Sequence, residues 1–178
     1  MSFGLDYVSG PSPAVLKANN VAFVCRYLSE VNAQTQIKLL TLPEAQALSH
    51  DGIAIVSNFE WYASRPSEGF ASGAFDAGIA RDQHAACGGP PDRPIYFSVD
   101  EDVSGAQVAD YFRGVASVIG LHRTGAYGSF RVLQYLFANN LISWGWQTYA
   151  WSGGQWLPPA QAQIQQYNNG QTDRKSVV

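Results

Sequence analysis

Short runs of β-branched and aromatic residues alternate along this chain with longer segments of helical pattern. Runs such as VAFVCRYL (21–28) and PIYFSVD (94–100) are apolar at consecutive positions, which is typical of strands covered on both faces. Strands of this kind that alternate with helices indicate a parallel sheet. The expected strands are residues 3–8, 21–28, 53–60, 94–100, 124–128, 142–150 and 162–168, with 172–178 as a short eighth.

Hydroxyl-bearing residues mark where the intervening helices begin. Thr41 and Glu44 have the spacing of a capping box, and Ser104 and Ser129 stand at the N-cap positions of two further helices. The residues between the sixth and seventh strands, WSGGQWLPP, have no helical pattern. The expected helices are residues 13–19, 42–50, 72–87, 104–119 and 130–138.

Two architectures are consistent with this alternation. With 178 residues the chain has the length of a single domain, which favours an open, doubly wound sheet. The count of about eight strands instead favours a closed (β/α)8 barrel, although such barrels usually exceed 200 residues. A small TIM-type α/β barrel over 1–178, with some helices reduced to loops, satisfies both observations and is the fold we predict.

The composition excludes several classes of partner. Only 11 residues are Lys or Arg and the net charge is −3, so there is no basic cluster to bind nucleic acid. No apolar run reaches the roughly 18 residues of a membrane span, and the N-terminus lacks the pattern of a signal peptide. Charged residues make up 14% and aromatic residues 13%, which suits a neutral, hydroxylated ligand.

No metal or cofactor is expected from the motifs. His50, His84 and His122 share no metal-ligand spacing and are expected at the surface. There is no GxGxxG motif, P-loop or GxSxG elbow. Cys25 and Cys87 are predicted to be reduced structural thiols, with a disulfide between them as the alternative.

Polar side chains recur where the predicted strands end. Ligand sites of parallel α/β folds lie at the carboxyl ends of the strands. The sequence therefore predicts a carboxylate-rich, aromatic-lined pocket at one end of the barrel. The candidate residues are Asp6, Arg26, Glu60, Asp100, Asp102, Tyr127, Trp146, Gln147, Gln166 and Asp173.

The run Asp100-Glu101-Asp102 has a specific geometry. Residues two apart on a strand share a face, so Asp100 and Asp102 are expected to point together. Two close carboxylates raise the pKa of one of them, and a protonated acid beside an ionised carboxylate is what glycosidic-bond hydrolysis uses. The alternative for Asp102 is that it merely opens the helix capped by Ser104.

Several segments together resemble one known family. The segments are GLDY, FVCRYLS, LTLPEAQALSHDGIAIV, FDAGIARDQHAACGGP with PIYFSVDEDV, YFRGV, TGAYGS and WQTYAWS. They are similar to the glycoside-hydrolase-like domain family of unknown function found in bacterial exported proteins and phage proteins. That family is related to the family 25 glycoside hydrolases, which are lysozymes that cleave peptidoglycan. The resemblance extends from Gly4 to about Gln166.

The resemblance implies a (β/α)8-type barrel with its site at the strand carboxyl ends. Family 25 enzymes carry an aspartate on strand one, an Asp-x-Glu pair after strand four and an aspartate on the last strand. Asp6 and Asp100 match the first two aspartates, Asp102 stands where the glutamate is found, and Asp173 matches the last.

A glycan-processing barrel acting on cell-wall peptidoglycan is the leading hypothesis. Asp102 is the candidate general acid, with Asp100 and Asp6 as its partners and Glu60 as the second candidate for the acid. Because Asp102 is one methylene shorter than glutamate, we expect weak turnover with sugar binding retained. Residues expected to line the sugar cleft are Arg26, Tyr127, Trp146, Gln147, Gln166 and Asp173. The alternatives are a non-catalytic glycan-binding domain, and a structural domain of a phage or secreted assembly.

Overall fold

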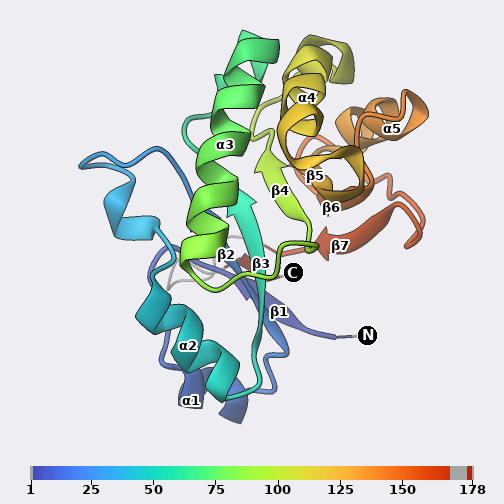
Figure 1. Cartoon of the computed structure of the whole chain (residues 1–178). Helices are drawn as coiled ribbons and strands as arrows, with labels where there is room; N and C mark the ends of the chain where they lie inside the picture. The colour runs from blue at the N-terminus through green and yellow to red at the C-terminus, as the bar shows by residue number, and fades with distance from the viewer. Residues whose placement is uncertain (1, 169–175, 178) are drawn as a thin grey trace.

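A computed structural model describes residues 2–168 and 176–177 of the chain. Seven parallel strands form a sheet that curls into a half-barrel, with helices on its outer side (Figure 1). The strands are β1 (Gly4–Asp6), β2 (Phe23–Leu28), β3 (Ala54–Phe59), β4 (Ile95–Ser98), β5 (Thr124–Gly128), β6 (Trp144–Thr148) and β7 (Ala162–Gln166). The helices are α1 (Pro13–Ala18), α2 (Leu42–His50), α3 (Phe70–Ala86), α4 (Gly105–Ile119) and α5 (Phe130–Ala138).

The sheet is not the closed eight-stranded barrel that the sequence predicts. The strand order is β7-β6-β5-β4-β3-β2-β1-β8, and β8 (Ser176–Val177) pairs with β1 in the antiparallel direction. Nothing in the described part of the chain pairs β8 with β7. A parallel strand needs a crossover connection of about a dozen residues or more, and only residues 167–175 separate β7 from β8. The short connection therefore favours a β8 that runs antiparallel to the other strands.

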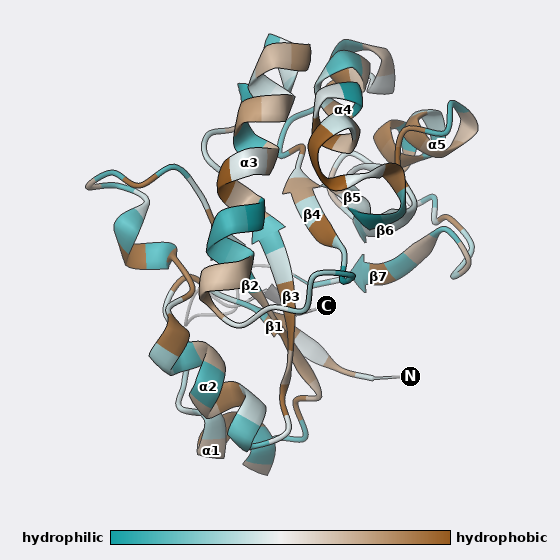
Figure 2. Ribbon diagram, viewed as in Figure 1, coloured by the Kyte–Doolittle hydropathy of each residue, from teal (hydrophilic) through white to brown (hydrophobic). Residues whose placement is uncertain are grey.

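Strand residues alternate between the two faces of the curled sheet. Cys25, Tyr96, Tyr127 and Trp146 pack together on its concave face. The opposite face carries the largest hydrophobic cluster, in which strand residues such as Phe97 pack against α3, α4 and α5. Figure 2 shows β3 hydrophobic over its first part and hydrophilic at its carboxyl end, where the polar groups gather.

The predicted helix caps are present with one difference. Thr41 accepts a hydrogen bond from the Glu44 backbone N–H, and Ser104 forms a complete capping box with Gln107. The Glu44 side chain, however, does not complete a box with Thr41. It pairs instead with the buried Arg26, at 2.6 Å between Arg26 Nε and Glu44 Oε1.

Helices α3 and α4 approach each other closely through two glycines. A Cβ on Gly73 would lie 2.0 Å from the carbonyl oxygen of Tyr111, and one on Gly114 would lie 2.1 Å from that of Phe70. Each glycine therefore leaves room for the backbone of the other helix. This contact fixes the helical layer behind β3 and β4, the strands that carry part of the site.

The structure agrees with the prediction for the two cysteines but not with the prediction for His84. Cys25 and Cys87 are both free thiols, which confirms that they do not pair. His84 is buried, contrary to the prediction that it lies at the surface. Its ring nitrogens are satisfied by Ser57 Oγ and the Pro90 carbonyl, each at 2.9 Å, and this pairing permits its burial.

No helix among the described residues has the length and apolar character needed to cross a membrane. Nor does any group of three or more His, Cys, Asp or Glu side chains gather there in a way that could hold a metal ion.

Candidate functional site

A polar cleft lies at the carboxyl ends of the strands. Its volume is about 200 Å³, below the roughly 300–1,000 Å³ of pockets for drug-sized ligands, so it has room for one part of a larger substrate. Each of strands β1 to β7 supplies a residue, either within the strand or directly after it. The lining residues are Asp6, Tyr27, Asn58, Glu60, Ser98, Asp100, Tyr127, Trp146 and Gln166.

Asp6, at the end of β1, is the most deeply buried carboxylate of the cleft, with 8% of its surface exposed. Tyr27 donates a hydrogen bond to Asp6 Oδ2 at 3.0 Å, while Oδ1 has no partner in the part of the chain that the structure describes. Desolvation by burial raises the pKa of Asp6 from 3.8 to about 7, although the Tyr27 hydrogen bond opposes the shift. Asp6 can therefore hold a proton near neutral pH.

Glu60 follows β3 and faces a cation. Lys38 Nζ lies 2.7 Å from Glu60 Oε1 and 5.0 Å from the centre of the Tyr27 ring. Lys38 belongs to η1 (Gln36–Lys38), a short 3-10 helix in the connection between β2 and α2. This connection brings one positive charge to a cleft that contains three carboxylates.

Asp100 stands at the exposed mouth of the cleft. Desolvation raises the pKa of its carboxyl group, and the negative charge of Glu60 raises it further. Lys38 acts in the opposite direction and lowers the pKa of Asp100. The cleft thus combines two carboxyl groups whose pKa is raised, Asp6 and Asp100, with a third that is paired to lysine.

The remaining wall of the cleft presents hydrogen-bonding side chains, two of which are aromatic. Tyr127 donates to Gln166 Oε1 at 2.9 Å, and Asn58 pairs with Ser98 Oγ at 2.8 Å. Trp146 is 1% exposed, yet its Nε1 donor has no partner among the described residues. Because buried polar groups are normally paired, Trp146 Nε1 and Asp6 Oδ1 are available to a ligand or to water.

The structure places Asp102 outside the cleft. Its side chain is 57% exposed and forms an ion pair with Arg131 of α5. Tyr96, Ser98 and Asp100 all point toward the concave face. The alternation does not continue to Asp102, because β4 ends at Ser98 and the chain bends at residues 101–102 before α4. Asp102 therefore does not point together with Asp100, contrary to the prediction from strand spacing.

Two further predicted residues do not line the cleft. Arg26 points to the opposite face of β2, where it pairs with Glu44 and donates to the Tyr7 carbonyl at 2.7 Å. Gln147 is fully buried and bonds the Leu157 N–H and the Gln155 carbonyl, which holds the connection between β6 and β7. Both have neighbours that do face the cleft, Tyr27 and Trp146, and adjacent strand residues cannot share a face. Asp173, also predicted for the cleft, lies outside the described residues.

Four residues of the site were not singled out in the sequence. Asn58 and Ser98 lie two residues before Glu60 and Asp100, and that spacing is a signal the sequence contains. Tyr27 has no such signal, because no other residue of β2 lines the cleft. Lys38 comes from a connection rather than a strand end, and no local pattern identifies it.

Comparison with known proteins gives related sequences and folds. Residues 14–177 match the model of the Rv2525c-like, glycoside hydrolase-like domain family. The chain is 33% identical over 154 residues to Rv2525c of Mycobacterium tuberculosis, which is named as a candidate peptidoglycan hydrolase. That alignment covers 80% of this chain and 64% of the relative, so the chain spans less than two thirds of the relative's length.

Solved structures show the same architecture. The crystal structure of the Tat-secreted M. tuberculosis protein Rv2525c in complex with L-tartrate superposes with a TM-score of 0.90 at 29% identity, covering 99% of this chain and 93% of that one. A family 25 glycosyl hydrolase from Bacillus anthracis superposes with a TM-score of 0.59 at 10% identity, covering 99% and 87% of the two chains. At that identity the second likeness concerns the fold alone.

Proposed function

Because this chain belongs to the Rv2525c-like, glycoside hydrolase-like domain family, we propose that it hydrolyses cell-wall glycan, with peptidoglycan as the substrate class. The observation that carries the proposal is the cleft itself, in which a buried acid with a pKa of about 7 and a lysine-paired carboxylate lie at the carboxyl ends of the strands. The name of the M. tuberculosis relative supports the substrate class.

The proposed chemistry divides the work between two carboxyl groups. Glycosidic-bond hydrolysis needs one protonated acid for the leaving oxygen and one carboxylate that activates water or stabilises the oxocarbenium-like charge. Asp6 fits the acid because burial raises its pKa to about 7. Glu60 fits the carboxylate because Lys38 faces it at 2.7 Å. Asp102, outside the cleft, has neither role in this proposal.

Two buried polar atoms without partners among the described residues support a hydroxylated ligand. A sugar hydroxyl could accept from Trp146 Nε1, and protonated Asp6 could donate from Oδ1 to another oxygen of the glycan, because Oδ2 already accepts from Tyr27. Asp100, at the mouth of the cleft, would contact the next part of the glycan. Since the cleft holds only about 200 Å³, most of a polymeric glycan would lie outside it.

The site of action is part of the proposal. The M. tuberculosis relative is a Tat-secreted protein, and peptidoglycan lies outside the cytoplasmic membrane. We therefore propose that this domain acts in the cell wall.

Digestion of purified peptidoglycan tests the hydrolase. The released reducing ends are measured for the unmodified domain and for Asp6→Asn and Glu60→Gln, with Asp102→Asn as the matched control. We expect the first two variants to lose roughly 100- to 10,000-fold in rate, the usual size of general acid–base catalysis, and the control to keep its rate.

The alternative outcome separates turnover from binding. If the unmodified domain releases no reducing ends but is retained on insoluble peptidoglycan, the proposal that it hydrolyses peptidoglycan is refuted. The domain is then a glycan-binding domain. If Asp102→Asn loses activity while Glu60→Gln keeps it, the assignment of the two carboxyl groups is wrong.

A further inference from the structure

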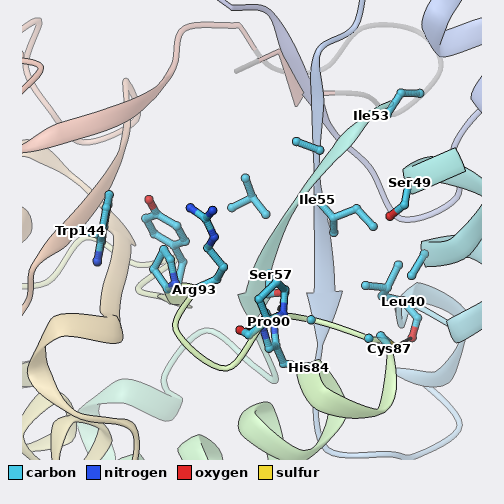
Figure 3. Close-up of a pocket in the computed structure, with 17 residues that line it drawn as sticks. Leu40, Ser49, Ile53, Ile55, Ser57, His84, Cys87, Pro90, Arg93 and Trp144 are labelled. Carbon is cyan, nitrogen blue, oxygen red and sulfur yellow. Dashed lines mark hydrogen bonds between the residues drawn. The ribbon is translucent and has the colours of Figure 1, made fainter. Parts of the chain in front are cut away.

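A second and larger cavity lies at the opposite ends of the strands from the polar cleft (Figure 3). Its volume is about 510 Å³, within the range of small-molecule pockets. Tyr96 and Trp144 contribute to this cavity, whereas Ser98 and Trp146, two residues further along the same strands, line the polar cleft. The two hollows are therefore separate sites at the two ends of the half-barrel.

The cavity exists because β4 begins late. β2 pairs with β3 from Ala54 onward, but β4 first pairs with β3 at Ser57, opposite Ile95. Pro94, which has no N–H to donate, precedes the strand. Within the described chain, the first half of β3 thus has no strand on that side, and Ala54, Ile55 and Val56 face the opening.

One backbone donor points into this opening. The Ala54 N–H donates to the Ala22 carbonyl on the β2 side. Because successive residues of a strand direct their N–H groups to opposite sides, the Ile55 N–H points away from β2 and toward the cavity. No described strand accepts from it there.

The walls are mostly apolar, and their buried polar groups are already paired. Leu40, Ile53 and Ile55 line one side, and Tyr96 and Trp144 the other. The buried His84 and Ser57 bond each other, so they need no ligand to satisfy them. An apolar body would fill this space without leaving those two groups unpaired.

Arg93 is the charged group of the cavity. Figure 3 shows its side chain extending into the space between Trp144 and Ile55. Among the described residues it forms no ion pair with a carboxylate. Its backbone carbonyl accepts from Arg123 Nε at 3.0 Å, which fixes its position without using the guanidinium.

From this arrangement we propose that the cavity binds a small amphiphilic carboxylate. The carboxylate would lie between the Arg93 guanidinium and the Ile55 N–H, and the apolar body would lie against Leu40 and Ile53. Arginine pairs with carboxylates through two parallel hydrogen bonds, which gives the site its preference for the anion. The proposal concerns a site remote from the polar cleft and does not depend on glycan hydrolysis.

Calorimetric titration with decanoate, below its critical micelle concentration, tests the site. Decanol, which has the same chain but no charge, is the matched ligand. Arg93→Gln should weaken decanoate binding about tenfold, the loss expected for hydrogen bonds to a charged group. Octanoate should bind about tenfold more weakly than decanoate, because it buries two methylenes fewer.

Two further variants decide where decanoate binds. Ala54 is exposed and lines the cavity, so Ala54→Trp should block the cavity and abolish binding without disturbing the core. Arg113→Gln removes a half-exposed arginine on α4 and should change nothing. The proposal is refuted if decanoate does not bind, if decanol binds equally well, or if Ala54→Trp binds decanoate like the unmodified protein.

Discussion

Replacement of Asp6 by asparagine should change how the stability of this protein depends on pH. Burial raises the pKa of Asp6 from 3.8 to about 7 on folding. Between these two values the folded state binds the proton more tightly than the unfolded state. The protonated carboxyl group therefore contributes stability that is fully present below pH 3.8 and is lost as the pH rises through about 7.

The size of the effect follows from the shift. The interval between pH 5 and the folded-state pKa of Asp6, about 7, is two pH units, and each unit corresponds to about 1.36 kcal/mol. The Asp6 contribution to the free energy of unfolding should thus fall by about 2.5 kcal/mol between pH 5 and pH 8. Asparagine does not titrate, and its side-chain oxygen can still accept from Tyr27.

Urea denaturation of the unmodified protein and of Asp6→Asn at pH 5 and pH 8 measures this difference. We expect the unmodified protein to lose about 2.5 kcal/mol more than the variant over that interval. Asp110→Asn is the matched control, because that carboxylate is 67% exposed and should leave the pH dependence unchanged. If the two pH curves of the unmodified protein and Asp6→Asn are parallel, Asp6 titrates like an exposed aspartate and the reasoning is refuted.

Three further changes have definite expected outcomes. Lys38→Met removes the cation that lowers the pKa of Asp100, so a carbon-13 NMR titration should show that pKa higher in the variant; an unchanged value would contradict the geometry. Asp102→Asn should alter the free energy of unfolding by less than about 1 kcal/mol, because the Arg131 pair is exposed, and a larger loss in urea denaturation would be inconsistent with this. Gly114→Ala places a Cβ 2.1 Å from the Phe70 carbonyl and should cost about 1–3 kcal/mol by the same assay, whereas Gly78→Ala on α3, with open space around it, should not destabilise the protein.

The sequence predicts the strands of this fold better than its closure. Apolar runs such as PIYFSVD identify buried parallel strands because both faces of each strand must be covered. Closure of the sheet depends on how the last residues return to β1, and that is a matter of connection length. The short connection after β7 gives an antiparallel β8, which the strand-like pattern of residues 172–178 does not reveal.

The site could be predicted only where the strand pattern continues to the residue in question. Asp6, Glu60 and Asp100 follow apolar runs directly and reach the cleft. Asp102 does not, because the chain bends after β4. Arg26 and Gln147 illustrate a different limit.

Arg26 and Gln147 lie on the face of their strands that points away from the cleft. The two-residue period shows that neither can share a face with its neighbour, Tyr27 or Trp146, but it does not say which of the two neighbours faces the cleft. Lys38 could not be found in this way, because its position depends on the path of a connection between β2 and α2.

A crystal structure of the domain soaked with a chito-oligosaccharide or a muropeptide is the most direct test of the central claim, that the polar cleft is the glycan site. We predict a sugar ring in the cleft with one hydroxyl oxygen within hydrogen-bonding distance of Trp146 Nε1 and another within reach of Asp6 Oδ1, the two buried side-chain atoms that have no partner among residues 2–168. Glu60 and Asp100 should face the same ring or its neighbour. A sugar bound elsewhere on the surface, with only water between Asp6 and Trp146, would contradict the account.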